Sequence, residues 1–116
     1  MSIERLLGSA SRLRDDADEL GSILVEEGSV DCVYNPLKYA WDIHERYIQI
    51  AGGRGAKTIM LGMNPGPHGM GQMGIPFAAT SMVRDLLGIS NISVEQPSTP
   101  HPKRPVIGPE YPREEV

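Results

Sequence analysis

The first quarter of the chain carries apolar side chains at every third or fourth position. They are Ile3, Leu6, Leu7, Ala10, Leu13, Ala17, Leu20 and Leu24. This spacing is typical of an amphipathic helix, and the charged residues between them would form its solvent-exposed face. Gly28 follows the last repeat and is a residue that ends helices. We therefore expect one helix over residues 2–26.

A second helical repeat begins at Asn35 and Pro36, which suit the N-cap and the first helical position. Its apolar face would comprise Leu37, Ala40, Trp41, His44, Tyr47, Ile48 and Ala51. Glycines terminate it, and a short β-prone segment at 57–63 follows. Because a helix that leads into a buried strand is typical of α/β folds, we expect a central parallel sheet flanked by helices.

The predicted strand leads into a Gly, Pro and Met loop over residues 64–77, which begins with Asn64. Thr80 or Ser81 can cap a third helix that ends before Gly88. From residue 93 onward the hydrophobic pattern breaks down. Six prolines interrupt it, at positions 97, 100, 102, 105, 109 and 112. This composition predicts either a disordered tail or a loop that is ordered by partners outside this chain.

Composition narrows the function classes. With 116 residues, 40% of them hydrophobic, the chain is one domain at most, and we expect it to end before its fold does. A net charge of −4 means that nucleic-acid binding would rest on local basic patches. The single Cys32 excludes an internal disulfide and a Cys-rich metal site. Without a signal peptide or a long apolar run, we expect a soluble, intracellular protein that does not span a membrane.

The loop 64–77 carries the candidate chemistry. Pro65 and Pro67 stiffen the backbone beside Asn64, and the interspersed glycines allow a ligand to approach the main chain. Phe77 offers a flat apolar face to an aromatic ligand. The Asn64 amide is neither a strong base nor a nucleophile, but it can aim a water by accepting and donating hydrogen bonds. An aimed water suits a reaction with a dissociative, cation-like transition state, which a weak nucleophile can capture. The alternative is that the loop is structural or holds a phosphate.

The sequence GMNPGPHGMGQMGIPF, residues 62–77, resembles the first catalytic motif of the single-strand-selective monofunctional uracil-DNA glycosylases. The resemblance continues in VYNPLKYAW, SMVRDLLGI and HPKRPVIG, and it covers roughly residues 30–116. It implies the N-terminal half of a single glycosylase domain. We expect an N-terminal helix at 1–29, an α/β catalytic-loop region at 30–92 and a Pro-rich loop at 93–116.

The resemblance also implies roles for individual residues. Asn64 would position the hydrolytic water and Phe77 would stack on the extruded base. Backbone groups around Gly66 and Met70 would help to hold a water that senses the 5-position of the pyrimidine. His68 and Ala78 stand where the family often has an aromatic residue and Gly, respectively. His68, Lys103 and Arg104 are candidate pocket or DNA contacts.

By resemblance, the expected activity is hydrolysis of the N-glycosidic bond of uracil, and of 5-substituted uracils, in single- and double-stranded DNA. No metal or cofactor is implied. The enzyme would act in the cytoplasm and nucleoid of a bacterium or in a eukaryotic nucleus.

The family's second catalytic motif, an HPSPxNP-like loop, its second Asn and its duplex-opening wedge lie downstream and have no counterpart among these residues. We therefore expect this chain to be inactive without a C-terminal half. The alternative is a catalytically incomplete fragment. It would act with a complementary C-terminal polypeptide, or as a non-enzymatic DNA- or nucleotide-binding module.

Overall fold

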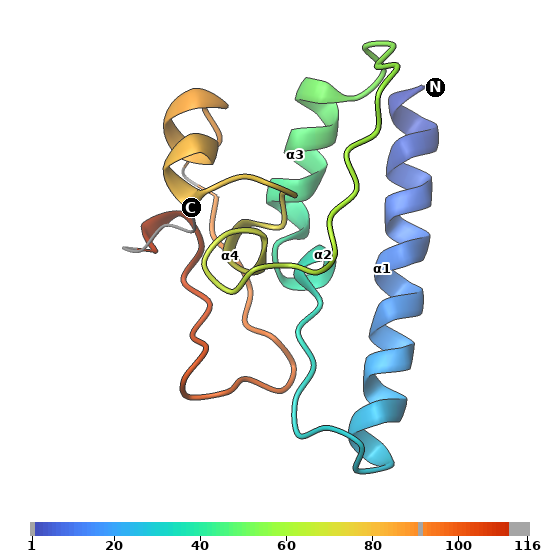
Figure 1. The fold of residues 1–116 in the computed structure, drawn as a ribbon, viewed down its shortest axis with the longest axis vertical. Helices are drawn as coiled ribbons and strands as arrows, with labels where there is room; N and C mark the ends of the chain where they lie inside the picture. Colours follow the sequence, from blue (N-terminus) through green and yellow to red (C-terminus); the bar gives the residue numbers. More distant parts are fainter. Residues whose placement is uncertain (1, 91, 112–116) are drawn as a thin grey trace.

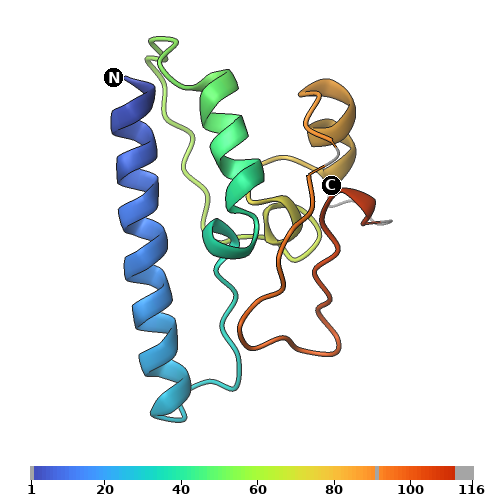
Figure 2. The same ribbon diagram turned by 180° about the vertical axis from the view of Figure 1, so that it is seen from behind.

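The computed structural model describes residues 2–90 and 92–111. Within these ranges the chain is helical, with the order α1 (Ile3–Glu26), α2 (Pro36–Tyr39), α3 (Trp41–Ala51), α4 (Met70–Met73), η1 (Met82–Leu86) and η2 (Gly108–Glu110). α1 runs along one side of the molecule, and α3 lies beside it (Figures 1 and 2). None of the described helices is long and apolar enough to cross a membrane.

The prediction of the first helix is confirmed by α1. The hydroxyl of Ser2 caps its start by accepting a hydrogen bond from the Arg5 backbone N–H at 3.2 Å. After its end, Gly28 takes a left-handed conformation with φ of 78°. The C-terminal part of α1 approaches the following segment so closely that a Cβ on Gly21 would lie 2.8 Å from Cγ1 of Val33. Glycine at position 21 therefore allows the chain to pack against α1.

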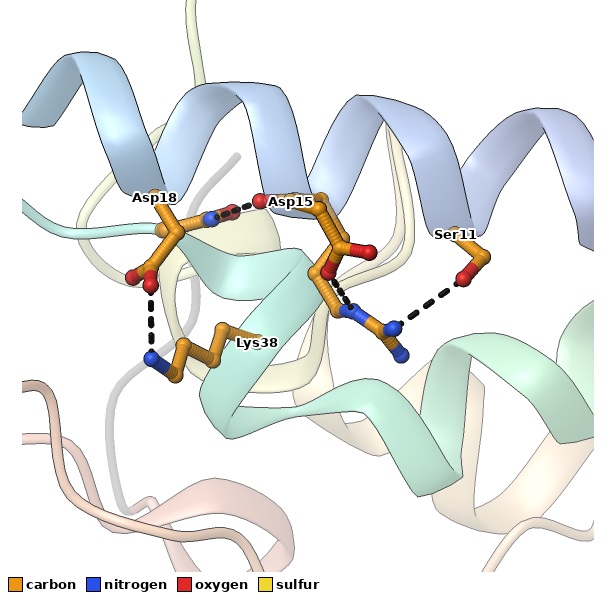
Figure 3. Close-up of polar contacts among 6 residues, drawn as sticks. Ser11, Asp15, Asp18 and Lys38 are labelled. Atoms are coloured by element: carbon orange, nitrogen blue, oxygen red, sulfur yellow. Dashed lines mark hydrogen bonds and ion pairs between the residues drawn. The ribbon is translucent and has the colours of Figure 1, made fainter.

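Polar contacts join α1 to the start of α2 (Figure 3). Lys38 Nζ lies 2.7 Å from an Asp18 carboxylate oxygen, and the Asn35 amide donates to the Arg14 carbonyl at 2.9 Å. Asn35 occupies the predicted N-cap position, but its side chain bonds to α1 and makes no capping hydrogen bond. The Arg14 guanidinium lies 4.5 Å from the centre of the Trp41 ring, which adds a cation–π contact to α3.

The predicted second helix is divided into α2 and α3 at Ala40, which has φ of −111° and ψ of 29°. Ala40 is buried, and a Cβ on Gly74 would lie 3.1 Å from the Ala40 Cβ. The break therefore coincides with the place where the loop 64–77, called the motif loop below, packs onto the helices. The third predicted helix forms as two α-helical residues, 80–81, followed by the π-helical turn η1, and Gly88 follows it with φ of 69°.

The expected central parallel sheet is wrong for the described residues, which contain no strand and no sheet. Residues 57–63 run extended alongside α1 and α3 (Figures 1 and 2), but no second segment pairs with them. A strand needs a neighbour to satisfy its backbone N–H and C=O groups. The apolar side chains of this segment stay in solvent; Ile59, Leu61 and Met63 are 90%, 92% and 97% exposed.

The core lies where α3 meets the motif loop and η1. Its buried members are Ile43, Met73, Ile75, Val83 and Ile89. A smaller cluster joins Tyr39 and Ala40 to Val106. The Pro-rich region is thus ordered where it is described, because Val106, Gly108 and Pro109 are buried against the rest of the molecule. Residues 112–116 of the predicted Pro-rich loop lie outside the described part of the chain.

Candidate active site

The motif loop has an anchored half and an exposed half. From Gly69 to Ile75 most residues are buried, and Met73 and Ile75 enter the core. The short helix α4, which the sequence did not predict, orders this half. The Gly71 N–H donates to the Gly66 carbonyl at 2.7 Å, and a Cβ on Gly71 would lie only 2.6 Å from that oxygen. Glycine at position 71 is therefore required by this turn.

Asn64 lies in the exposed half, directly after the extended segment. Pro65 and Pro67 follow it and restrict the backbone. Among the described residues, none forms a hydrogen bond with the Asn64 side chain. Its carbonyl oxygen and amino group are thus open to a water or a ligand.

Phe77 closes the motif loop in an unusual backbone conformation. It is the one described non-glycine residue with a positive φ, 61°, and a bulky residue in this region carries strain of about 1–3 kcal/mol. Its ring lies against Gly62, where an added Cβ would be 3.1 Å from the ring Cζ. The ring is otherwise open, because 62% of the residue is exposed. An exposed ring on a strained backbone position thus lies against Gly62, which is two residues before Asn64 in the chain.

Gly66 and Met70 lie at the turn between the two halves of the loop. The carbonyl of Gly66 accepts from Gly71, and that of Met70 accepts from the Gly74 N–H at 2.8 Å. Their own N–H groups bond to none of the described residues. Two backbone donors are therefore available on the motif loop, both after Asn64 in the chain.

His68 is held by the Pro-rich region. Its Nδ1 lies 2.6 Å from the Tyr111 hydroxyl, and the two rings stack with centroids 5.5 Å apart. The half-buried imidazole is therefore a structural contact of the loop.

Gln72 is the strongest link between the motif loop and the Pro-rich region, and the sequence reasoning did not single it out. The residue is 2% exposed. Its Nε2 donates to the carbonyls of Pro67 and Pro105 at 3.1 and 2.7 Å, and its Oε1 accepts from the N–H groups of Ile107 and Gly108 at 2.8 and 3.2 Å. The sequence signal that could have identified Gln72 was an amide side chain among glycines, because the amides of Asn and Gln carry separate donor and acceptor atoms.

Two further side chains fix the loop from the helical side. The buried Tyr39 hydroxyl donates to the Gly71 carbonyl, and burial together with the neighbouring Tyr34 raises the pKa of Tyr39. His44 Nδ1 lies 2.7 Å from the Gly74 carbonyl. Burial lowers the pKa of His44, and its hydrogen bond to Gly74 opposes that shift. Since a carbonyl only accepts, Nδ1 carries the proton in this contact.

Lys103 and Arg104 lie in a turn that lines the same pocket as Pro65 and Pro67. They are exposed, and with His101 they border a pocket of about 630 Å³ that also includes Gly66 and Gly71. The structure thus brings the two predicted cations to the motif loop, whereas His68 faces Tyr111. In the described part of the chain, no three or more His, Cys, Asp or Glu residues form a group that could hold a metal ion.

Comparison with known proteins agrees with the motif. The chain is 46% identical to the single-strand selective monofunctional uracil DNA glycosylase of Bos taurus over 99 residues, which are 85% of this chain and 36% of the relative. It is 48% and 46% identical over 87 residues to the proteins of that name from Rattus norvegicus and Mus musculus, covering 75% of this chain and 31% of each relative. No protein-family model matches.

The chain spans about a third of the length of these relatives, in their N-terminal region. The aligned residues make up 75–85% of this chain, and 46–48% of them are identical. The chain therefore belongs to the single-strand-selective monofunctional uracil-DNA glycosylase family.

Proposed function

We propose that this chain carries the water-positioning loop of a DNA-repair glycosylase that hydrolyses the N-glycosidic bond of uracil in DNA. The observation that carries the proposal is the pairing of an unengaged amide with an exposed ring on one loop. Asn64 makes no hydrogen bond with the described residues, and Phe77 is held open against Gly62. The names of the relatives supply the substrate, uracil in DNA.

In the proposed reaction, the target base leaves the DNA stack and places one face on the Phe77 ring. The bond between sugar C1′ and uracil N1 breaks, and the electron pair leaves with uracil. The Asn64 carbonyl accepts a hydrogen bond from a water and aims its oxygen at C1′. The new C1′–O bond forms, the water loses one proton to solvent, and the uracil anion takes up a proton. The products are free uracil and an abasic site.

We infer that the backbone groups of Gly66 and Met70 hold a second water near the 5-position of the bound pyrimidine. Their free N–H groups support this role. The site would then discriminate among 5-substituted uracils by whether the substituent can replace that water. Such an enzyme works where DNA is, inside the cell, on both single- and double-stranded DNA.

A second candidate function is favoured by the surroundings of Asn64. The uracil anion needs a stabilising donor, and each described histidine has its Nδ1 bonded to another group of the protein. His44 is buried against Gly74, His68 stacks on Tyr111, and His101 Nδ1 accepts from the Lys103 N–H. The 116-residue chain by itself would then bind DNA without releasing uracil, and would need a complementary polypeptide for catalysis.

The test is a uracil-release assay with a uracil-containing oligonucleotide, on the full-length protein and on the 116-residue chain. The proposal expects the full-length protein to produce uracil and an intact strand with an abasic site. Borohydride should trap no covalent protein–DNA adduct, because no lysine takes part. Failure of the full-length protein to release uracil would contradict the glycosylase assignment. Release by the 116-residue chain alone would contradict the second candidate.

A further inference from the structure

The pocket beside the motif loop has an apolar interior and a basic edge. Its buried members include Pro36, Tyr39 and Val106, and its exposed members include Lys103 and Arg104. Its volume of about 630 Å³ is within the range of small-molecule sites, roughly 300–1,000 Å³. Pro65, the residue after Asn64, also lines it. An occupant of this pocket would therefore sit next to the residue that we propose aims the water.

No acidic side chain of the described residues borders the basic edge. No Asp or Glu lines the pocket, and the ion pairs of the described residues join Arg14 to Asp15, Lys38 to Asp18 and Arg84 to Asp85. Within residues 2–90 and 92–111, Lys103 and Arg104 thus have no ion-pair partner, on a chain whose net charge is −4. A local basic patch on an acidic protein selects an anionic ligand at that point.

Hydrogen bonds hold this edge in place before any ligand arrives. The Tyr34 hydroxyl accepts from the His101 N–H at 2.8 Å and donates to the Arg104 carbonyl at 2.7 Å. The Lys103 N–H donates to His101 Nδ1 at 3.1 Å, and Gln72 binds the Pro105 carbonyl at 2.7 Å. A turn fixed in this way loses little conformational entropy when it binds a ligand.

We propose that this pocket binds one nucleotide of a single-stranded DNA, adjacent to the nucleotide that is cleaved. Lys103 and Arg104 would contact its phosphate, and the apolar interior with Tyr39 and the flanking prolines would accept its base. The inference rests on the proposed function, since it is the position beside Asn64 that identifies the anion as DNA. The same chemistry would suit a free nucleotide, which the test separates from a strand.

The test measures binding of a fluorescent, uracil-free single-stranded oligonucleotide to the full-length protein by anisotropy over a range of salt. K103Q/R104Q should weaken binding at least about fivefold at low salt. It should also reduce the slope of log affinity against log salt by about 0.7 to 1.4, the value for one or two phosphate contacts on single-stranded DNA. The matched control R46Q/K57Q removes the same charge from exposed positions outside the pocket, and it should leave that slope unchanged.

A second measurement needs no substitution. Cys32, the single cysteine of this sequence, lines the pocket and is half-buried. The oligonucleotide should slow alkylation of Cys32, as followed by peptide mass spectrometry, whereas thymidine monophosphate at equal nucleotide concentration should not. Equal slopes for the two double variants, or unchanged Cys32 alkylation, would overturn the proposal. Equal protection by the free nucleotide would overturn the strand assignment. Because the DNA contains no uracil, these results are independent of whether uracil is released.

Discussion

The ring of Phe77 packs on Gly62, and a methyl group at position 62 would lie 3.1 Å from the ring Cζ. This contact is tighter than an ordinary van der Waals distance, so a larger residue at 62 must displace the ring. Gly62 before the motif loop and Phe77 at its end thereby fix the surface that we propose receives the base.

Gly62→Ala should therefore lower uracil release more than it lowers stability. Residue 62 is exposed, so the added methyl group meets the ring and little else. We expect the single-turnover rate to fall by about tenfold or more, since displacement of a site by about 1 Å can cost about 100-fold. Gly8→Ala is a control for assay effects, because Gly8 lies in α1 and an added Cβ would meet nothing nearer than an Arg12 side-chain nitrogen at 3.6 Å. An unchanged rate in Gly62→Ala would mean that the ring position does not matter.

The left-handed conformation of Phe77 predicts a difference between two substitutions. Phe77→Ala and Phe77→Gly both remove the ring, but only glycine takes φ of 61° without strain. The Gly variant should be more stable than the Ala variant by about 1 kcal/mol in denaturant unfolding. Both should release uracil slowly. Equal stability of the two variants would show that position 77 relaxes out of this conformation.

Gln72 joins the motif loop to the Pro-rich region through four hydrogen bonds. Gln72→Ala leaves the N–H groups of Ile107 and Gly108 without their acceptor. We expect a loss of about 2–3 kcal/mol in unfolding free energy, because each buried unsatisfied group costs about 1–3 kcal/mol. Gln96→Ala removes a single bond to the Val106 carbonyl at a more exposed site and should cost less than half as much. A similar loss in both variants would contradict the special role of Gln72.

His44 should make stability depend on pH. Burial lowers its folded-state pKa, so below its unfolded value of about 6.5 the unfolded chain binds a proton that the folded chain does not. The unfolding free energy should therefore lose nothing to His44 above that pH, and it should fall as the pH drops from about 6.5 towards 5.

Thermal unfolding at pH 7.5, 6 and 5 measures this effect. His44→Asn keeps a donor for the Gly74 carbonyl but does not titrate, so its melting temperature should fall less between pH 7.5 and 5. The control His101→Gln removes a histidine from an exposed position and should keep the steeper dependence. The same slope for His44→Asn and the unchanged protein would exclude His44 as the source.

Local pattern was enough to predict α1, because three- and four-residue spacing and a terminal glycine act within the helix itself. It was not enough for residues 57–63, where the β-prone composition was recognised but a strand also needs a pairing partner. Nor did it show the break at Ala40, which coincides with the approach of Gly74 from 34 positions away in the chain. Local propensity is overridden where distant segments meet.

In the candidate site, too, some residues could be identified from the sequence and others could not. Asn64 and Phe77 were identified by the motif, and their proposed roles stay predictions. Gln72, Tyr34 and Tyr39 were not identified, since their importance comes from hydrogen bonds that span 32 to 70 positions. The positive φ of Phe77 was likewise invisible, because no sequence rule places an aromatic residue in that region.

The most direct test of the central claim is a single-turnover uracil-release measurement on Asn64→Ala in the full-length protein. If Asn64 aims the water, the rate should fall at least about 100-fold, whereas affinity for uracil-containing DNA should stay close to that of the unchanged protein. Gln49→Ala removes an exposed amide from α3 and should leave both quantities unchanged. Equal rates for Asn64→Ala and the unchanged protein would contradict the account.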